Sequence, residues 1–265
     1  MPLPSVRNLL NRRALISNLV ARDFQQRYVG SSMGWLWAAV HPAVLLASYI
    51  FVFVLVLKMP APAESGTKSM ALYIFAGILP WLLFQESVQR SATSVVDSTN
   101  LVTKTLFPSE VLPVTVFFSN LLNHLIGLLV LLGIVAVAEA KIHLAVALVP
   151  VYLLLLAMFT VGVSWIAAGL QVFLRDTSQV ISILMIFWFW ATPIFFTIGK
   201  LPGWMQPFVR LNPLAQVVDA YRRAILAGTL PAANDMLLLA GVSSAAFLLG
   251  GLFFRRAKRG FGDVL

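Results

Sequence analysis

The chain has 265 residues, of which 60% are hydrophobic and 11% charged, and its mean hydropathy is +0.89. This composition excludes an ordinary soluble domain and predicts an integral membrane protein. In a soluble protein the net charge of +9 would suggest a nucleic-acid partner, but here it is better explained by cytoplasmic arginines that orient membrane helices.

Residues 1–34 are expected to form a cytoplasmic arm. Their five arginines are not followed by a continuous apolar core, so we expect no cleavable signal peptide. Between residues 15 and 28 apolar side chains recur at helical spacing, which predicts a helix lying on the cytoplasmic leaflet. Gly30 and Gly34 in "GSSMG" precede the apolar run, and we expect them to form a hinge and not a helix-dimer seam.

The remaining residues, 35–265, are expected to form one all-α transmembrane domain. Crossing a hydrocarbon core of about 30 Å takes about 20 helical residues. Six segments come near this length: residues 35–57, 70–88, 111–138, 144–170, 180–196 and 236–254. The second is the weakest, because its apolar part contains Pro80 and ends at Phe84, and we expect a kink or an early exit there.

Basic residues predict the orientation of these spans. With six spans both termini lie on one side, which holds five arginines of the arm, three basic residues of the loops and four of the tail, or 12 of the 19 lysines and arginines. The other side holds the remaining seven. This asymmetry favours both termini in the cytoplasm.

The outward segment between the last two spans contains a predicted amphipathic helix. Asn212 is a good N-cap, Pro213 suits the first helical position, and Gly228 supplies a stop. The apolar stripe consists of Leu214, Val217, Val218, Tyr221 and Ile225. We expect this helix to dip into the membrane interface or to cover another part of the protein.

The sequence offers little catalytic or metal-binding chemistry. All ten carboxylates fall in predicted loops or at span ends, which disfavours a proton-coupled transporter and a polyprenol-phosphate transferase. Cysteine is absent, which excludes disulfides and thiol catalysis, and the three histidines have no partner at helical spacing, so no metal site is expected. No phosphate-binding loop is present, so ATP would have to bind to another chain.

Two groups of residues inside the spans have alternative interpretations. Asn120, Asn123 and His124 in the third span either hydrogen-bond to other helices or line a water-filled path. The aromatic cluster "IFWFWATPIFF" of the fifth span either packs against neighbouring helices or lines a passage suited to sugar rings. Trp35, Trp37 and Trp81 fit an interfacial belt.

Seven segments, in this order, resemble one family. They are "RDFQQRYVGSSMGWLWAAVHP", "GILPWLLF", "NLVTKTLFPSEVLPV", "FLRD", "FWATPIFF", "LNPLAQVVDAYR" and "GFGDVL". Together they resemble the membrane subunits of type-2 ABC exporters for bacterial surface polysaccharides, which include O-antigen, capsule and teichoic-acid export permeases. The resemblance covers nearly the whole chain. One mild departure from the family pattern is His41-Pro42, where asparagine-proline is common.

The resemblance implies a transport subunit of the cytoplasmic membrane that is not an enzyme. It would form a homodimer and bind two copies of an ATP-binding subunit, which would hold the ATP and Mg²⁺, while this chain would bind no cofactor. The substrate would be a polysaccharide linked to a polyprenyl diphosphate, threaded through a channel at the dimer interface.

The resemblance also implies roles for particular residues. ATPase contacts would involve Arg22, Asp23, Arg27, Lys104, Thr105, Phe107 and Pro108. Arg175 and Asp176 are either a further coupling contact or a simple topology marker. The channel would be lined from the first and fifth spans, by Trp35, Trp37, Phe187, Trp188, Trp190 and Phe195, and a periplasmic gate would include Trp204, Asn212, Pro213, Tyr221 and Arg222.

Three other functions fit the sequence less well. A drug or small-lipid exporter of the same superfamily often carries a large extracellular domain or a fused ATPase, and neither is evident. A membrane glycan-assembly enzyme would act without any ATPase, but the missing acidic cluster argues against it. A secondary transporter is disfavoured because no ionisable group was expected inside the spans.

Overall fold

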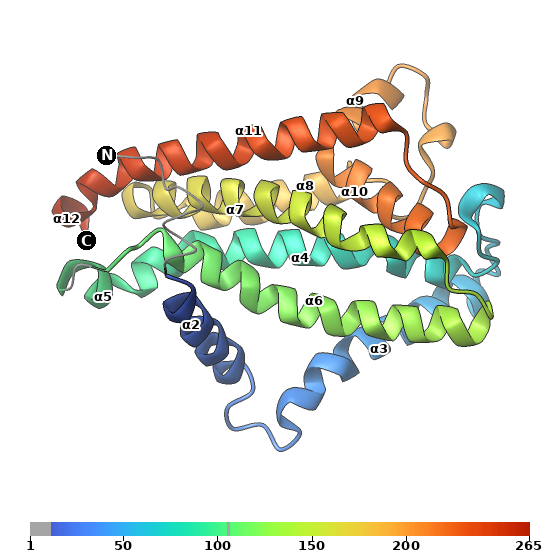
Figure 1. Cartoon of the computed structure of the whole chain (residues 1–265), viewed down its shortest axis with the longest axis horizontal. Helices are drawn as coiled ribbons and strands as arrows, with labels where there is room; N and C mark the ends of the chain where they lie inside the picture. The colour runs from blue at the N-terminus through green and yellow to red at the C-terminus, as the bar shows by residue number, and fades with distance from the viewer. Residues whose placement is uncertain (1–11, 105–106) are drawn as a thin grey trace.

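The chain folds into a bundle of long helices in the computed structural model, which describes residues 12–104 and 107–265 (Figure 1). Within those residues the only β structure is an isolated bridge between Pro60 and Ser69. The predicted all-α membrane fold is therefore confirmed.

The long helices are α2 (Arg13–Gln26), α3 (Trp37–Tyr49), α4 (Met70–Asp97), α6 (Val111–Ala138), α7 (Val149–Phe173), α8 (Thr177–Trp190), α10 (Pro213–Arg222) and α11 (Ala233–Ala257). The described residues also include three short α-helices: α5 (Thr99–Lys104), α9 (Gln206–Leu211) and α12 (Phe261–Val264). The π-helical segments η2 (Ile50–Val56) and η6 (Arg223–Ala227) extend α3 and α10, and the 3₁₀ segment η4 (Leu144–Leu148) precedes α7.

Five helical segments of the described residues are long and apolar enough to cross a membrane. They are Gly34–Val56, Met70–Asp97, Val111–Ala138, Leu144–Phe173 and Ala233–Gly260. The bounds predicted for the third span agree with α6 at both ends. The early exit predicted for the second span is wrong, because α4 continues without a break past Pro80 to Asp97.

The predicted fifth span is not one full-length helix. α8 has 14 residues, about 21 Å at about 1.5 Å per residue, which is shorter than a hydrocarbon core of about 30 Å. It ends at Trp190 because Pro193 follows, and the residue before a proline disfavours the helical conformation. The six-span count therefore stays a prediction, with α8 and the segments after it in the place of the fifth span.

The centre of the bundle is α4. Of its most apolar stretch 83% is buried, against 11% to 33% for the other four long segments. A helix that is apolar all round needs neighbours on every side, and α4 packs against α6, α7, α8 and α10. Small residues such as Ala76 and Gly77 let those neighbours approach closely.

The two ends of the bundle differ. One end carries α2, α5, the turn between α7 and α8, and α12 (Figure 1). We call it the basic end, because basic residues of α2, of α5, of the turn after α7 and of the chain just before α12 gather there: Arg13, Arg22, Lys104, Arg175, Arg255, Arg256, Lys258 and Arg259. The opposite end carries the connection from η2 to α4, the turn before α7, and the segment from η6 to α11.

α7 and α11 cross in close backbone contact. A Cβ atom placed on Gly250 of α11 would lie 2.8 Å from the Cα of Gly162 of α7, closer than real Cβ atoms approach. Ala246, one turn earlier on α11, also faces Gly162. Small residues thus bring the two backbones into contact, as is common between membrane helices.

This crossing predicts the effect of adding one methyl group. Gly250→Ala should lower the stability of the purified protein by about 1–3 kcal/mol, because the backbone of α7 has to move away. Gly241→Ala is the matched control on the same helix, since nothing lies within 4 Å of its added Cβ. Thermal unfolding in detergent measures both, and equal unfolding temperatures for the two variants would contradict the packing described.

Candidate functional site

The end of α8 is tied to α10 and α4 by one arginine. The chain leaves the helical path at Thr192 and Pro193, so carbonyl groups there lack the partners that a continuing helix would supply. Arg222 of α10 donates to the carbonyl oxygen of Pro193 at 2.7 Å and to that of Ile194 at 2.5 Å. These bonds satisfy the backbone of the broken segment from inside the protein.

Arg222 also binds Tyr73 of α4. Its Nε donates to the Tyr73 carbonyl oxygen at 3.1 Å, and Nη1 donates to the Tyr73 hydroxyl at 3.0 Å. The guanidinium carbon lies 3.6 Å from the centre of the Tyr73 ring, within the range of a cation–π interaction. Gly77 makes room for this arrangement, because a Cβ there would lie 2.6 Å from Nη2 of Arg222.

The capping residues predicted for the outward helix are confirmed. The Asn212 side chain accepts from the amide of Leu214 at 3.1 Å, Pro213 opens α10, and Gly228 ends η6 with a φ of 68°. The predicted apolar stripe is buried throughout: Leu214, Val217, Val218, Tyr221 and Ile225. Asn212 also accepts from the Trp188 indole at 3.0 Å, so the cap of α10 holds α8 as well.

The predicted gate residues therefore occupy different environments. Trp204 is 71% exposed at a loop tip before α9, and Pro213 is half-buried. Tyr221 and Arg222 are buried and act as anchors of α10 within the chain. A gating role for these residues stays a prediction.

A second polar cluster lies nearer the basic end, where α2 meets α4 and α6. Asp23 pairs with Arg90 at 2.8 Å and with Arg27 at 3.5 Å. Asn120 of α6 accepts hydrogen bonds from Arg27 and from Arg90, and its amide donates to the Ser87 hydroxyl at 3.0 Å. These bonds fix the end of α2 against two long helices.

The other two polar residues of α6 are Asn123, which bonds to the chain after α2, and His124, which bonds to α10. The Tyr28 hydroxyl donates to Asn123 at 2.9 Å, and burial raises the pKa of Tyr28, so this hydroxyl keeps its proton at neutral pH. His124 lies 3.2 Å from the Leu79 carbonyl oxygen and 3.0 Å from the Tyr221 hydroxyl. The polar residues of the third span thus form hydrogen bonds to neighbouring elements, while the water-filled path stays a prediction.

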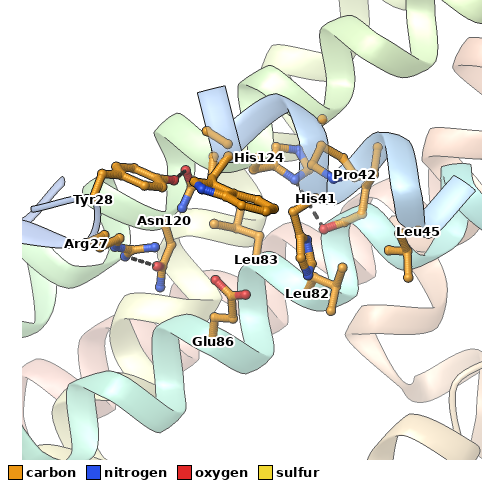
Figure 2. Close-up of a pocket in the computed structure, with 15 residues that line it drawn as sticks. Arg27, Tyr28, His41, Pro42, Leu45, Leu82, Leu83, Glu86, Asn120 and His124 are labelled. Atoms are coloured by element: carbon orange, nitrogen blue, oxygen red, sulfur yellow. Dashed lines mark hydrogen bonds between the residues drawn. The ribbon is translucent and has the colours of Figure 1, made fainter. Parts of the chain in front are cut away.

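The same residues border a cavity of about 290 Å³ between α3, α4 and α6 (Figure 2). Glu86 of α4 and His41 of α3 line it from opposite helices. The expectation that every carboxylate lies in a loop or at a span end is wrong for Glu86, because α4 continues to Asp97. No group of three or more metal-ligating side chains occurs among the described residues.

The predicted channel aromatics divide into two sets. Trp188 packs against Phe84 and Phe159, and Phe195 stacks on Phe53 of η2 at 5.7 Å between ring centres. The other four are at least 45% exposed in the single chain: Trp35, Trp37, Phe187 and Trp190. The packing interpretation therefore holds for the first set, while the second set is largely exposed in the single chain and includes Trp37, which borders the cavity described above.

The residues expected to contact an ATPase lie at the basic end where they are described. Arg22, Arg175 and Asp176 are exposed, and Asp23 and Arg27 are half-buried in the cluster beside α6. Phe107 packs against the core, and the carbonyl oxygen of half-buried Pro108 accepts from the amide of Val111 at the start of α6. The side chain of Lys104 and the whole of Thr105 lie outside the described residues.

The turn between α2 and α3 adopts the conformation that glycine favours. Gly30 has a φ of 82° and Gly34 a φ of 54°, and no other atom lies within 4 Å of a Cβ placed on either. Backbone conformation, and not space, therefore requires glycine at both positions. The Trp37 indole donates to the Ser31 hydroxyl across this turn at 3.0 Å. A hinge function for the turn stays a prediction.

Sequence reasoning missed the partners of Arg222. Tyr73, Gly77 and the carbonyl of Pro193 were not singled out, although Pro193 inside an apolar run is a signal for a helix end. Tyr73 and Gly77 carried no comparable local signal, because they contact a residue on a distant helix.

Comparison with known proteins places this arrangement in a family. The ABC-2 type transporter family matches residues 14–226, from α2 through η6. The matched region includes both polar clusters and the broken helix, and it ends before α11.

Individual proteins are similar over most of the chain. The O-antigen export system permease protein RfbA of Myxococcus xanthus is 30% identical over 264 residues, which cover 98% of both chains. An RfbA of Klebsiella pneumoniae is 26% identical over 253 residues, 95% of both chains. The capsule polysaccharide export inner-membrane protein CtrC of Neisseria meningitidis serogroup A is 19% identical over 220 residues, 81% of this chain and 80% of the relative.

The Arg222 contacts predict which substitutions destabilise the opposite end. Arg222→Leu should strongly lower the unfolding temperature, because three buried carbonyls lose a donor and each unsatisfied group costs about 1–3 kcal/mol. Arg222→Lys should have an intermediate effect, since it keeps the charge but not the planar fork. Thermal unfolding in detergent, with hydrogen exchange of residues 191–197, measures both.

Arg223 provides the matched control for this experiment. It is exposed, and in the described part of the chain its ion pair is with Asp219 at the surface, so Arg223→Leu should cost about 0–1 kcal/mol. If Arg222→Leu and Arg223→Leu unfold at the same temperature, Arg222 does not hold the broken helix.

Proposed function

Because this chain belongs to the ABC-2 type transporter family, we propose that it is the membrane subunit of an ATP-driven exporter of bacterial surface polysaccharide. The substrate is O-antigen or capsule polysaccharide, carried on a polyprenyl diphosphate lipid. The observation that carries this proposal is the similarity along 98% of the chain to a protein named an O-antigen export permease. The named capsule exporter among the relatives supports the same substrate class.

In this proposal the protein lies in the cytoplasmic membrane with its basic end in the cytoplasm. The arginines of α2, the turn between α7 and α8, and the tail after α11 all belong to that end, as the positive-inside rule requires. Both termini are then cytoplasmic, and the broken helix after α8 lies in the outer half of the membrane.

Two copies of a separate ATP-binding subunit dock on the basic end. That partner holds ATP and Mg²⁺ and hydrolyses the nucleotide, while this chain binds no cofactor. Its docking surface consists of α2 and the exposed turn with Arg175 and Asp176. α2 suits this role because it buries none of its side chains completely and is held by the polar bonds of Asp23 and Arg27.

Two copies of this chain form the channel between them. α3 supports this arrangement, because only 11% of its most apolar stretch is buried in the single chain. The exposed aromatic residues Trp35, Trp37, Phe187 and Trp190 belong to α3, to the turn before it and to α8. Aromatic faces suit the C–H surfaces of sugar rings, so these side chains contact the passing glycan.

The outer end of the channel is closed by the segment between α8 and α11. Broken helices at membrane depth occur where they are buried in protein or line a cavity, and such segments commonly move during transport. Here α10 is anchored inside the bundle by Tyr221 and Arg222, while Trp204 is free at the loop tip. We assign the gate to this segment.

Deleting the gene tests the substrate. The deletion should leave lipid-linked polysaccharide in the cytoplasmic leaflet and none at the cell surface, and the chain should copurify with a separate ATPase. Extraction of lipid-linked glycan and surface staining measure the two pools. Normal surface polysaccharide in a clean deletion strain would contradict the assignment of polysaccharide as the substrate. Glycan assembly by the purified chain alone would indicate an enzyme.

Neutralising one exposed carboxylate tests the ATPase docking surface. Asp176→Asn should lower glycan-stimulated ATP hydrolysis by about tenfold, because a charge-assisted contact contributes about 1.5–3 kcal/mol. Asp235→Asn is the control, since Asp235 is exposed at the opposite end of the bundle. The rate of ATP hydrolysis by the purified complex measures both effects. Equal rates in the two variants would contradict the contact and leave Asp176 as a marker of membrane topology.

A further inference from the structure

One turn of α6 contacts both the end of α2 and α10. Asn120, Asn123 and His124 lie three and four residues apart, so they share one face of the helix. Asn120 and His124 are 2% and 5% exposed. We call these three residues the α6 polar turn.

The contacts with α2 are hydrogen bonds from consecutive residues. Arg27 donates to Asn120, and the Tyr28 hydroxyl donates to Asn123 at 2.9 Å. Because α2 completely buries none of its side chains, these bonds contribute much of its fixed position against α6. A displacement of α2 therefore acts on the α6 polar turn.

The contact with α10 is buried. His124 lies with Nδ1 3.2 Å from the Leu79 carbonyl oxygen, which can only accept, so Nδ1 carries the proton. In the neutral ring Nε2 then accepts from the Tyr221 hydroxyl at 3.0 Å. Tyr221 is fully buried, and its neighbour Arg222 holds the broken end of α8.

The two contacts lie very close together along α6. Four residues of an α-helix rise about 6 Å, so the partners of Asn120 and His124 are separated by about one turn. The residues joined in this way are far apart in the chain, since Tyr28 and Tyr221 lie 95 and 97 positions from their partners. The end of α2 and α10 are thus attached to the same turn of α6.

We propose that the α6 polar turn transmits displacement of α2 to α10, with His124 and Asn123 as positioning residues for the gate. The inference rests on the proposed function, because α2 is taken to contact the ATPase and α10 to belong to the gate. A turn of α-helix moves as a unit, so a force on Asn123 shifts His124 and with it the Tyr221 anchor.

Two conservative substitutions measure this coupling. Tyr28→Phe removes the hydroxyl that binds Asn123 after the end of α2, and Tyr221→Phe removes the one that binds His124 from α10, while both rings stay in place. The assembled complex is examined in inverted inner-membrane vesicles that contain lipid-linked polysaccharide. The readout is the amount of glycan translocated per ATP hydrolysed, which a merely structural contact would not change at constant stability.

Each single variant should lower this ratio by about fivefold, the equivalent of one hydrogen bond of about 1 kcal/mol. The double variant should be no worse than the lower of the two singles, because both substitutions interrupt the same connection. Independent sites would instead multiply, giving about a 25-fold loss. A multiplicative loss, or a wild-type ratio in either single variant, overturns the inference.

Tyr152→Phe is the control for loss of a buried hydroxyl. The Tyr152 hydroxyl is buried and has no hydrogen-bond partner among the described residues, so its removal should leave the ratio at the wild-type value. Asn123→Leu removes the same hydrogen bond from the side of α6. It should lower the ratio of glycan translocated to ATP hydrolysed as much as Tyr28→Phe does, and it serves as the test if Tyr28→Phe lowers the unfolding temperature. Absence of glycan translocation by the wild-type complex would contradict the proposed function, whereas a normal wild-type with unaffected variants contradicts only the α6 polar turn.

Discussion

The hydrogen bonds of Arg222 to the backbone after α8 are the interaction on which the outer half of the bundle depends. A membrane interior supplies no water to free carbonyl groups, so a helix can end there only where the protein supplies donors. The guanidinium of Arg222 on α10 supplies these donors. It packs against the Tyr73 ring, and Gly77 leaves room for it because it has no side chain. Because of this one side chain, the chain can replace part of a span by short helices and loops.

The same reasoning connects the two ends of the molecule. α4 is buried on all sides and provides Tyr73 towards one end and Ser87 and Arg90 towards the other. α6 lies beside it and adds the polar turn that contacts α2 and α10. Polar groups are costly inside a membrane protein unless they are paired, so these contacts restrict how the helices can move relative to each other. A subunit that passes movement from one face of the membrane to the other requires such restriction.

Local patterns in the sequence predict much of this architecture. The apolar run of α6 defines both of its ends, and Asn212, Pro213 and Gly228 define the outward helix. Prediction was less successful where tertiary contacts decide. Glu86 resembles the end of a span, but α4 continues to Asp97 because neighbouring helices bury most of that helix. The end of α8 at Trp190 lies inside an apolar run, where Pro193 is the one local signal for it. The site itself joins residues such as Tyr73 and Arg222, 149 positions apart, which no local pattern contains.

The chain belongs to the ABC-2 type transporter family, and in the proposed function the basic end would receive the ATPase and the broken helix would control the exit. Both roles depend on the orientation of the bundle. The chain has no cysteine, so a single cysteine introduced at Trp204 or at Arg175 is the only thiol available to a membrane-impermeant reagent in cells whose outer membrane is permeable to it. The account predicts labelling at position 204 and none at position 175 until the inner membrane is opened. Labelling of position 175 in cells with an intact inner membrane would contradict it.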